Sequence, residues 1–363
     1  MHQVALKRTL TALAFTSPSA AYGGVRPGFA VSSVTAGTKY SRSRNRLFSS
    51  SSFNAPEPPQ SMGVNVYNDI DFSVSTGQSS QSSIRNSDPD AVFVINGASR
   101  GIGLQFLRKL LKDTKGNIVA CCRSPDDAIG LQEILLSLEG SKSRDRIDLI
   151  KLDIENQDSI EQAVLEIERK YNRVDLLLNV AGILGDGKNT PGPERSLLKI
   201  EKGWLEKSFQ VNVIGPLMLS KELAPLMTQK RRTTKKKASN KDNEELIVEK
   251  KRPVAIIANL SARVGSISDN FLGGWYSYRM SKAALNQATR TLANELKRES
   301  VWCVALHPGT TDTDLSKPFQ RNVQEGRLFP VEFTVDSLMN VIDSMEEDNS
   351  GGLYDWAGKA IPF

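Results

Sequence analysis

The strongest constraint on the fold is a short glycine-rich stretch, NGASRGIG at residues 96–103, because of what flanks it. Before it stands AVFVI, a short apolar run typical of a buried strand, and after it LQFLRKLLK carries apolar residues at helical spacing. A strand, a glycine loop and a helix in this order point free backbone N–H groups at one spot, at the positive end of the helix dipole. Glycines also let the backbone approach a pyrophosphate closely. We therefore expect phosphate contacts from Gly97, Ser99, Arg100, Gly101, Ile102 and Gly103.

Strand-like runs and helix-like segments alternate along the rest of the chain. The strand-like runs are NIVACC, IDLIKLD, VDLLLNVAG, PVAIIANLS, VWCVALHPG and, near the end, GGLYDW. Between them stand LQEILLSL, IEQAVLEIERKY and MSKAALNQATRTLANELKRE, whose apolar residues recur at helical spacing. Such alternation indicates βαβ units. We predict an α/β fold, a doubly wound (Rossmann-like) parallel sheet of about seven strands, in a single domain over residues 90–363 that follows a disordered N-terminal extension.

The N-terminal extension has the composition of a targeting segment. Residues 1–56 carry seven Lys and Arg and no Asp or Glu, and they are rich in serine, which is typical of an organelle transit peptide. RLFSSS at residues 46–51 resembles a mitochondrial processing site and favours a mitochondrial address. A plastid transit peptide, or a tail without an address on a cytoplasmic protein, are the alternatives. Residues 57–89 are expected to be a polar, disordered linker.

A second basic segment, residues 228–252, interrupts the alternation before the strand PVAIIANLS. It holds ten basic and four acidic residues, and together with residues 1–56 it carries a charge of +13, whereas the whole chain carries +6. The remainder is thus acidic, at about −7, so no nucleic-acid partner is expected for the domain. We interpret residues 228–252 as a solvated insertion loop. A docking patch for an acidic partner, an RNA or an anionic lipid surface is the alternative.

Membrane spans and metal sites are not expected. No apolar run approaches the roughly 18–20 residues that are needed to cross a bilayer. The three cysteines, Cys121, Cys122 and Cys303, lack metal-type spacing and are too few for a disulfide scaffold. With only two histidines, histidine-based metal chemistry is not expected either.

The residues after the second strand indicate which dinucleotide is bound. A site that prefers NAD places an Asp or Glu at the end of this strand, on the ribose 2′-hydroxyl. Here the strand is followed by Arg123, and Arg100 stands in the glycine loop. A guanidinium can bind a 2′-phosphate with two hydrogen bonds. We therefore predict NADP(H) as the cofactor, the alternative being that both arginines are ordinary surface residues.

A tyrosine and a lysine four residues apart, Tyr278 and Lys282, form the chain's only Y-x-x-x-K pattern. On a helix this spacing puts both side chains on one face, whereas Tyr276 is rotated about 200° from Tyr278. A phenol with its ordinary pKa near ~10 is a poor acid or base at neutral pH, and a neighbouring ammonium favours the phenolate. We predict that Tyr278 protonates a carbonyl oxygen and that Lys282 lowers the pKa of Tyr278 and binds the cofactor.

These motifs together resemble the short-chain dehydrogenase/reductase family from about residue 91 to the C-terminus. The loop is similar to the family's TGxxxGxG, with Asn96 in place of threonine, and NVAG at residues 179–182 is similar to NNAG, with Val180 in place of an asparagine. More narrowly, residues 259–287 and the ending LYDWAGKAIPF resemble the C-factor-like and sniffer-type carbonyl reductase branch.

The resemblance implies roles for further residues. Cofactor contacts are expected from Asn179, Ala181 and Gly182, from Asp153 and the following Ile154 near the adenine, and from Pro308, Gly309 and Thr313 near the nicotinamide carboxamide. Asn212 matches the asparagine that helps to hold a proton-relay water with the lysine. The family also usually forms dimers or tetramers through its long helices, so a homo-oligomer is expected.

One position departs from the family pattern. The catalytic serine is usually the second of two adjacent serines after the fifth strand, and here these positions read Ser261-Ala262. In an extended strand Ser261 points to the opposite face from Ala262. We predict that Ser261, or a backbone group with a water, orients the substrate oxygen, and that Ser266 or Ser268 is the alternative.

The function predicted from these observations is an NADPH-dependent carbonyl reductase that acts on a small ketone or aldehyde. Phe271, Leu272, Trp275 and Tyr276 suggest an apolar pocket, or else only pack the helix against the body. The missing serine keeps open a second class, an NADP(H)-binding signalling or redox-sensing protein with little turnover. A third reading is an interaction protein that uses the basic insertion.

Overall fold

The structure, a computed structural model, describes residues 79–185, 193–228 and 252–363. The expected transit peptide, most of the expected linker and residues 229–251 of the insertion lie outside these ranges.

The core is a seven-stranded sheet in which every neighbouring pair is parallel, in the order β3-β2-β1-β4-β5-β6-β9. This confirms the predicted fold class. Its strands are β1 Val92–Asn96, β2 Asn117–Cys122, β3 Ile147–Lys151, β4 Leu176–Asn179, β5 Ala255–Leu260, β6 Val301–His307 and β9 Leu353–Asp355. β7 Thr310–Thr311 and β8 Leu328–Phe329 form a separate pair. The strand order reverses between β1 and β4, and in such sheets ligands bind at the carboxyl ends of the strands at this point.

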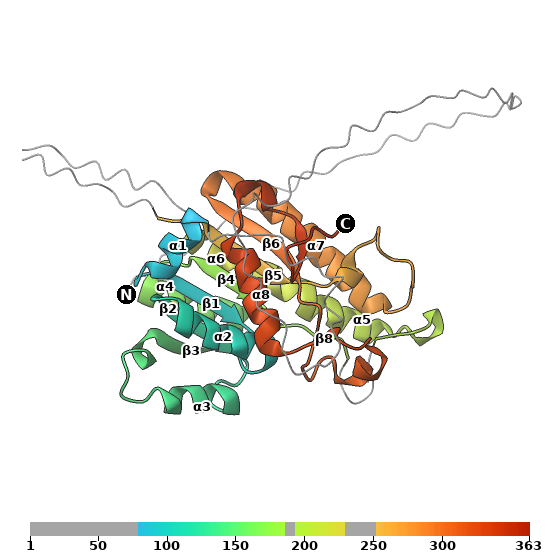
Figure 1. Cartoon of the computed structure of the whole chain (residues 1–363), viewed down its shortest axis with the longest axis horizontal. Coiled ribbons are helices and arrows are strands. Elements are labelled where there is room, and N and C mark those ends of the chain that lie inside the picture. The colour runs from blue at the N-terminus through green and yellow to red at the C-terminus, as the bar shows by residue number, and fades with distance from the viewer. Residues whose placement is uncertain (1–78, 186–192, 229–251) are drawn as a thin grey trace, which may run out of the picture. The chain divides into compact units, whose positions relative to one another are not determined.

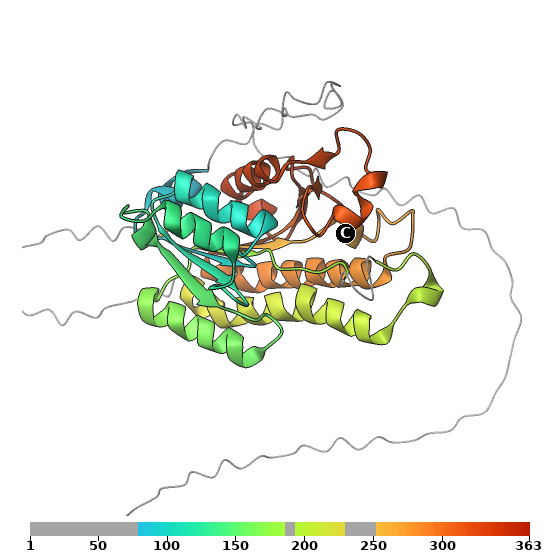
Figure 2. The same cartoon turned by 90° about the horizontal axis from the view of Figure 1, so that it is seen from below.

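Helices cover both faces of the sheet (Figures 1 and 2). Apolar residues of α2 Gly101–Asp113, α3 Ile129–Ser137 and α8 Val331–Asp343 form one core cluster with the strands. Those of α4 Gln157–Tyr171, α6 Gly215–Met227 and α7 Tyr276–Leu296 form a second cluster on the other face. α5 Lys202–Phe209 packs on α7. The strands are apolar on both sides because both sides are covered.

The domain begins earlier than predicted, because a helix, α1 Ser80–Ser87, lies within the expected linker. Its Arg85 is fully buried and forms an ion pair with Asp343 at the end of α8. Asn86 donates to the same carboxylate at 3.0 Å, and Gln81 accepts the backbone N–H of Val254 at 3.1 Å. The linker prediction is therefore wrong for residues 80–87. The sequence of this helix is mostly polar, so it has no apolar pattern that would predict packing. The helix instead docks on the domain through an ion pair.

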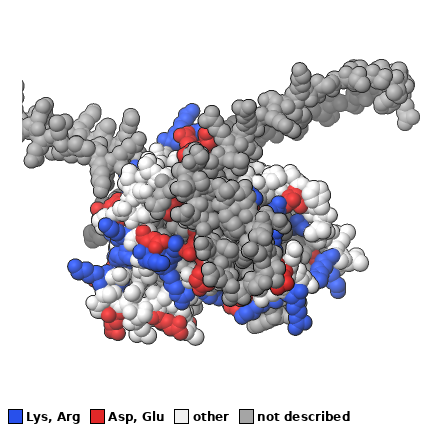
Figure 3. Space-filling model, viewed as in Figure 1, with Lys and Arg blue, Asp and Glu red and all other residues white. Residues whose placement is uncertain are grey.

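The ends of the basic insertion are anchored at the amino-terminal edge of the sheet. Arg252 donates to Asp175 at 2.8 Å and to the carbonyl of Leu226 at 3.2 Å, next to the starts of β4 and β5. These anchors therefore lie at the opposite edge of the sheet from the carboxyl ends of the strands. On the visible part of the face in Figure 3, basic and acidic side chains lie interspersed.

Candidate active site

The glycine loop packs backbone against backbone at the carboxyl end of β1. Gly97 has φ +93°, and a Cβ there would come within 2.7 Å of the backbone nitrogen of Ala181. A Cβ at Gly103 would overlap the carbonyl oxygen of Gly97. The N–H groups of Gly97 and Ala98 donate to the carbonyl of Cys121 at 2.9 and 3.0 Å. The loop therefore has no room for larger residues, as expected where a pyrophosphate lies close to the backbone.

Helix α2 starts at this loop with free donors. Arg100 occupies its N-cap in an extended conformation, and no side chain caps the first turn. The donors are thus available to a phosphate, which fits a dinucleotide. Arg100 and Arg123 are both exposed. Within the described ranges, the guanidinium of Arg100 has only a long contact with Asp314, at 3.6 Å.

The other predicted cofactor residues also surround the carboxyl edge of the sheet. Thr313 lies over the loop, since its methyl group would be 3.4 Å from a Cβ at Gly101. Gly309 has φ +72°, and a Cβ there would clash with the Phe329 ring at 2.5 Å, so this turn needs glycine. Asp153 accepts the N–H of Glu155 at 3.1 Å just after β3. Of the remaining predicted residues, Ile102 packs on the first core cluster and Ile154 belongs to the second.

Three buried asparagines form a ladder across β1, β4 and β5. Asn96 donates to Asn179 at 3.3 Å, Asn179 to Asn259 at 2.8 Å, and Asn259 to Thr289 on α7 at 2.9 Å. The strand register places the three side by side. The side chain of Asn179 thus links neighbouring strands of the sheet, and the ladder connects the glycine loop to α7. In the sequence, each of these asparagines stands at or near the end of an apolar run. This repetition alone does not reveal that the three side chains bind one another.

Tyr278 and Lys282 lie together on the first turns of α7, as the spacing predicted. The Lys282 ammonium is 5.6 Å from the centroid of the Tyr278 ring, is 3% exposed and donates to the carbonyl of Leu260 at 2.7 Å. Burial lowers the pKa of Lys282 to about 7 and raises that of Tyr278 well above its usual value. The net pKa of Tyr278 is therefore raised by burial and not lowered, contrary to the expectation. Instead, the phenol stays protonated at neutral pH, the state of a proton donor.

Asn212 sits in a π-helical turn, Gln210–Ile214, between α5 and α6. Its side chain accepts the N–H of Ile183 at 2.8 Å and donates to the Ile183 carbonyl at 3.0 Å and to Ser281 at 3.1 Å. A Cβ at Gly182 would be 3.2 Å from the Asn212 oxygen and 3.6 Å from the Lys282 nitrogen. The fold thus brings the predicted asparagine and lysine together. π-turns inside helices occur frequently at functional sites.

Comparison with known proteins decides the family. The model of the short chain dehydrogenase family matches residues 91–234 and 245–324, more than half of the chain. The chain belongs to this family.

Relatives and solved structures support the branch. The C-signal protein of Myxococcus xanthus is 28% identical over 52% of this chain and 93% of its own length. The NADPH-bound carbonyl reductase from chicken fatty liver is 26% identical, with a TM-score of 0.61 over 76% of this chain and 99% of that one. The carbonyl reductase Sniffer of D. melanogaster has a TM-score of 0.62 at 24% identity, over 76% of this chain and all of its own. The chain is thus similar to C-signal and to the chicken carbonyl reductase, and the likeness to Sniffer shows the same fold.

In this short chain dehydrogenase the three candidate serines are engaged by other groups. Ser261 is buried and donates to Asn286 on α7 at 2.6 Å. The hydroxyls of Ser266 and Ser268 donate to the carbonyls of the last two residues of the chain. Among the described residues, no hydrogen bond joins any serine to the Tyr278 hydroxyl. The role predicted for Ser261 is thus not supported by its hydrogen bonding.

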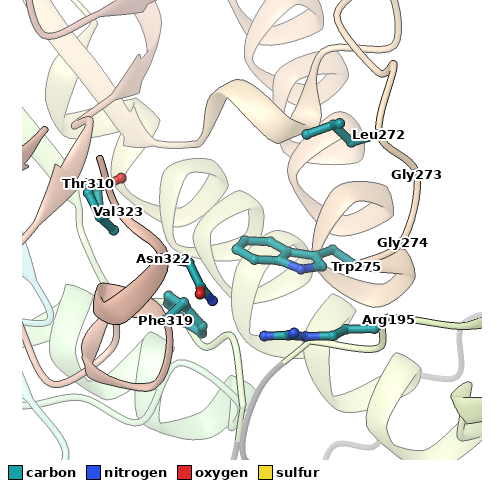
Figure 4. A pocket seen from close by; sticks show the side chains of 9 residues that line it. All are labelled: Arg195, Leu272, Gly273, Gly274, Trp275, Thr310, Phe319, Asn322 and Val323. Atoms are coloured by element: carbon teal, nitrogen blue, oxygen red, sulfur yellow. The ribbon is translucent and has the colours of Figure 1, made fainter. Parts of the chain in front are cut away.

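A pocket of about 450 Å³ (Figure 4) has Trp275 in its lining, and the Trp275 ring lies next to Tyr278. Trp275 forms one wall, with its ring centroid 6.3 Å from Tyr278 and 5.4 Å from Phe319. Leu272 and Trp275 line the pocket as expected. Phe271 and Tyr276 do not belong to its lining, which also includes Arg195, Gly273, Gly274, Thr310, Phe319, Asn322 and Val323. Phe319 and Asn322 belong to a short 3-10 helix, Lys317–Asn322, and Val323 follows it. This segment has no apolar periodicity by which these residues could be selected.

A buried glutamate, Glu194, ties this pocket to α7. Its carboxylate accepts the backbone N–H of Ser277 at 3.2 Å and the Ser277 hydroxyl. Its backbone carbonyl accepts the N–H of Trp275 at 2.5 Å. The carboxylate thereby caps the start of the helix that carries Tyr278, where a negative charge is favoured. No local pattern marks Glu194, because its partner Ser277 is 83 residues away in the sequence.

In the part of the chain that the structure describes, no group of three or more His, Cys, Asp and Glu residues is arranged to hold a metal ion. The helices of the same ranges include none that is long and apolar enough to span a bilayer.

Proposed function

We propose that this short chain dehydrogenase is an NADPH-dependent carbonyl reductase. The observation that carries the proposal is the pairing of Tyr278 with Lys282 beside an apolar pocket, at the edge of the sheet that also holds the glycine loop. The overall reaction would convert a ketone or aldehyde, NADPH and a proton into an alcohol and NADP⁺.

The residues present fit this cofactor. The tight packing at Gly97 and Gly103 and the uncapped start of α2 suit a pyrophosphate. Arg100 and Arg123 would hold the 2′-phosphate, and no carboxylate follows β2 directly to favour NAD. The chicken carbonyl reductase with a similar fold has NADPH bound. When bound, NADPH would supply the hydride for the carbonyl carbon.

The protein's own contribution is a protonated phenol. Tyr278 would donate its proton to the carbonyl oxygen as a general acid. Burial raises the pKa of the phenol, which keeps it protonated but makes it a weaker acid, so the proposal rests on the position of Tyr278 beside Lys282 and the pocket and not on its pKa. Lys282 has a pKa of about 7, so it can release or take up a proton near neutral pH. Together with Asn212 it would return a proton to Tyr278 from solvent. Trp275 and Phe319 would exclude water from one side of the substrate.

Ser261 would act on helix α7 rather than on the substrate, through its hydrogen bond with Asn286. The substrate oxygen would then be oriented by Tyr278 with a backbone group and a water. Turnover by Ser261→Ala that matches the wild type would support this division, whereas a loss as large as that of Tyr278→Phe would return Ser261 to direct catalysis.

The test is NADPH oxidation by the full chain with a panel of ketones, aldehydes and quinones, beside Tyr278→Phe and with NADH in parallel. We expect turnover that falls at least ~100-fold in the variant, the lower range for general acid catalysis. NADPH binding should be unchanged. Equal turnover in both proteins would refute the assignment of Tyr278.

A second candidate function is favoured by Ala262, which lacks the hydroxyl that the family pattern leads us to expect at this position. In this case the chain would bind NADP(H) for signalling or redox sensing with little turnover. Tight NADPH binding without oxidation by any carbonyl in the panel would select this function. Likeness to C-signal is compatible with either, since a fold does not fix a function.

Location and assembly are also proposals. We infer a mitochondrial address from residues 1–56, to be tested by fusing them to a fluorescent protein; plastid or cytoplasmic fluorescence would refute it.

A dimer or tetramer through the long helices, including α7, is to be tested by light scattering. For the basic insertion, unchanged partners and location after deletion of residues 230–251 would exclude a docking role.

A further inference from the structure

The pocket beside Tyr278 has one charged wall residue. Of the nine residues that line it, only Arg195 carries a charge, and the others are apolar or neutral. Figure 4 shows the Arg195 side chain lying alongside Trp275 and pointing toward Phe319 and Asn322 on the opposite wall. A single cation in an otherwise uncharged pocket distinguishes strongly between anionic and neutral ligands.

The guanidinium of Arg195 is not neutralised by its nearest carboxylate in the sequence. Glu194 directly precedes it, but both oxygens of Glu194 are used by Ser277. Among the described residues, Arg195 makes no ion pair or side-chain hydrogen bond, and its side chain is exposed. Its five N–H donors are therefore available to a ligand in the pocket.

The relative placement of Arg195 and Trp275 is fixed by the backbone. Gly273, Gly274 and Trp275 follow one another with φ of +64°, +65° and +55°, so a tryptophan is held in a left-handed conformation that side chains normally avoid. The bond from the Trp275 N–H to the Glu194 carbonyl holds this turn against the residue before Arg195. Strained residues that the surroundings hold in place concentrate at ligand sites.

We propose that the preferred substrates are aromatic carbonyl compounds that carry a carboxylate. The ring would pack against the wall that Trp275 and Phe319 form together, since these two rings contact each other with centroids 5.4 Å apart. The carboxylate would bind the guanidinium of Arg195 through two hydrogen bonds. Asn322 would add a neutral donor from the other wall. This substrate class rests on the proposed reductase function.

The first test compares matched substrates. We would measure kcat/KM of the full chain with NADPH for 4-formylbenzoate, for its methyl ester and for 4-formylbenzamide, with wild type and Arg195→Gln. The wild type should prefer the acid at least tenfold, and the variant should lose this preference because its KM for the acid rises much more than its KM for the ester. Lys199→Gln is the control, because Lys199 is exposed on the same segment outside the pocket. No preference in the wild type, or equal losses with acid and ester, would overturn the proposal.

The second test is independent of turnover. Binding of benzoate to the full chain with NADP⁺ would be measured by calorimetry for the wild type, Arg195→Gln and Lys199→Gln. We expect at least tenfold weaker binding in Arg195→Gln alone. If no carbonyl is reduced by the wild type, the reductase function fails, and this titration still decides the anion site: equal benzoate binding by all three proteins overturns it.

Discussion

The glycine loop, on the proposed cofactor side, and the pocket next to Tyr278, on the proposed substrate side, are held in place by different contacts. At Gly97, Gly103 and Ala181, backbone packs on backbone within distances that no side chain fits. At Trp275, the wall depends on side chains from separate segments, with Glu194 buried against Ser277 and Phe319 against the indole. The first kind of contact admits few residues, whereas the second admits many combinations.

This difference explains why a motif marks one side and not the other. Where only glycine fits, a glycine in the sequence indicates the backbone geometry directly. The spacing of the glycines along the chain is therefore enough to identify the loop. Where a contact joins Glu194 to Ser277 across 83 residues, neither residue type is unusual by itself. Substitutions on the two sides should therefore also differ in how much activity, NADPH affinity and stability they remove.

The largest effect is expected for Gly103→Ala, because its Cβ would overlap the carbonyl of Gly97. We expect NADPH affinity to fall at least ~100-fold, or the protein to fail to fold, as overpacking against backbone has no flexible side chain to relieve it. Gly203→Ala is the matched control, since Gly203 also lies in a helix but has open space around its Cβ position. It should stabilise the protein by roughly 0.5–1 kcal/mol. Titration of NADPH fluorescence and thermal unfolding would decide, and normal NADPH affinity in Gly103→Ala would contradict the packing argument.

Lys282→Met should separate activity from stability. We expect turnover to fall roughly 100-fold, in line with the loss of a proton-transfer group, while the free energy of unfolding rises by about 1–4 kcal/mol near pH 7, as when buried ionic groups are replaced by apolar ones. Burial lowers the pKa of Lys282 from 10.5 to about 7, so the unfolded chain binds a proton that the folded chain has released between these values. The free energy of unfolding of the wild type therefore rises with pH between about 7 and 10.5 because of Lys282.

The excess stability of Lys282→Met over the wild type should thus be largest below pH 7 and should disappear toward pH 10.5. Urea unfolding at a series of pH values measures it. Lys297→Met, on the exposed end of the same segment, is the control and should show no such dependence. A difference that grows with pH would contradict the burial argument.

Glu194→Ala tests the substrate side with a smaller expected loss. Without the carboxylate, the Ser277 N–H loses its partner and the start of α7 loses its cap, which typically costs about 1 kcal/mol. We expect kcat to fall about ten- to thirtyfold as Tyr278 becomes less well positioned, with NADPH affinity unchanged. Glu194→Gln should recover part of the rate because an amide oxygen still accepts one bond.

The control for Glu194 is Glu201→Ala, since Glu201 stands before α5 without a side-chain cap bond. Equal losses of NADPH affinity and kcat in Glu194→Ala would mean that the two sides of the cleft are not independent, and would remove the distinction drawn above.

Much of the fold and of the cofactor side could be predicted from sequence because both depend on local patterns. The seven strands appear as apolar runs, and the Tyr278–Lys282 pair follows from helical spacing. Three features could not be found in this way. Helix α1 docks through the Arg85–Asp343 pair, the asparagine ladder depends on strand register, and the raised pKa of Tyr278 depends on burial. All three are long-range properties of the packed structure.

Cofactor preference should respond more weakly, because exposed arginines are involved. Arg123→Ser should reduce the preference for NADPH over NADH by roughly tenfold, as expected when one charged hydrogen-bond donor to a phosphate is lost. Steady-state kinetics with both cofactors measure the ratio. Arg108→Ser is the control, since Arg108 is exposed on α2 and bonds to Gln105 within its own helix. If the preference for NADPH over NADH is unchanged in Arg123→Ser, Arg123 does not bind the 2′-phosphate and Arg100 would bind it alone.

The smallest effect on activity, and the only expected gain in activity, concerns Ala262→Ser. Ser261 is engaged with Asn286, so the position after it is where the family pattern would add a hydroxyl near the substrate oxygen. Removing one well-placed donor to a developing oxyanion costs about 10²–10³ in rate, but an added donor is not pre-organised by its surroundings. We therefore expect kcat/KM to rise only about three- to tenfold, with Ala262→Val as a control for added bulk. A loss in both variants would show that the space beside Ala262 is already needed by the substrate, and that this enzyme orients its carbonyl without a serine.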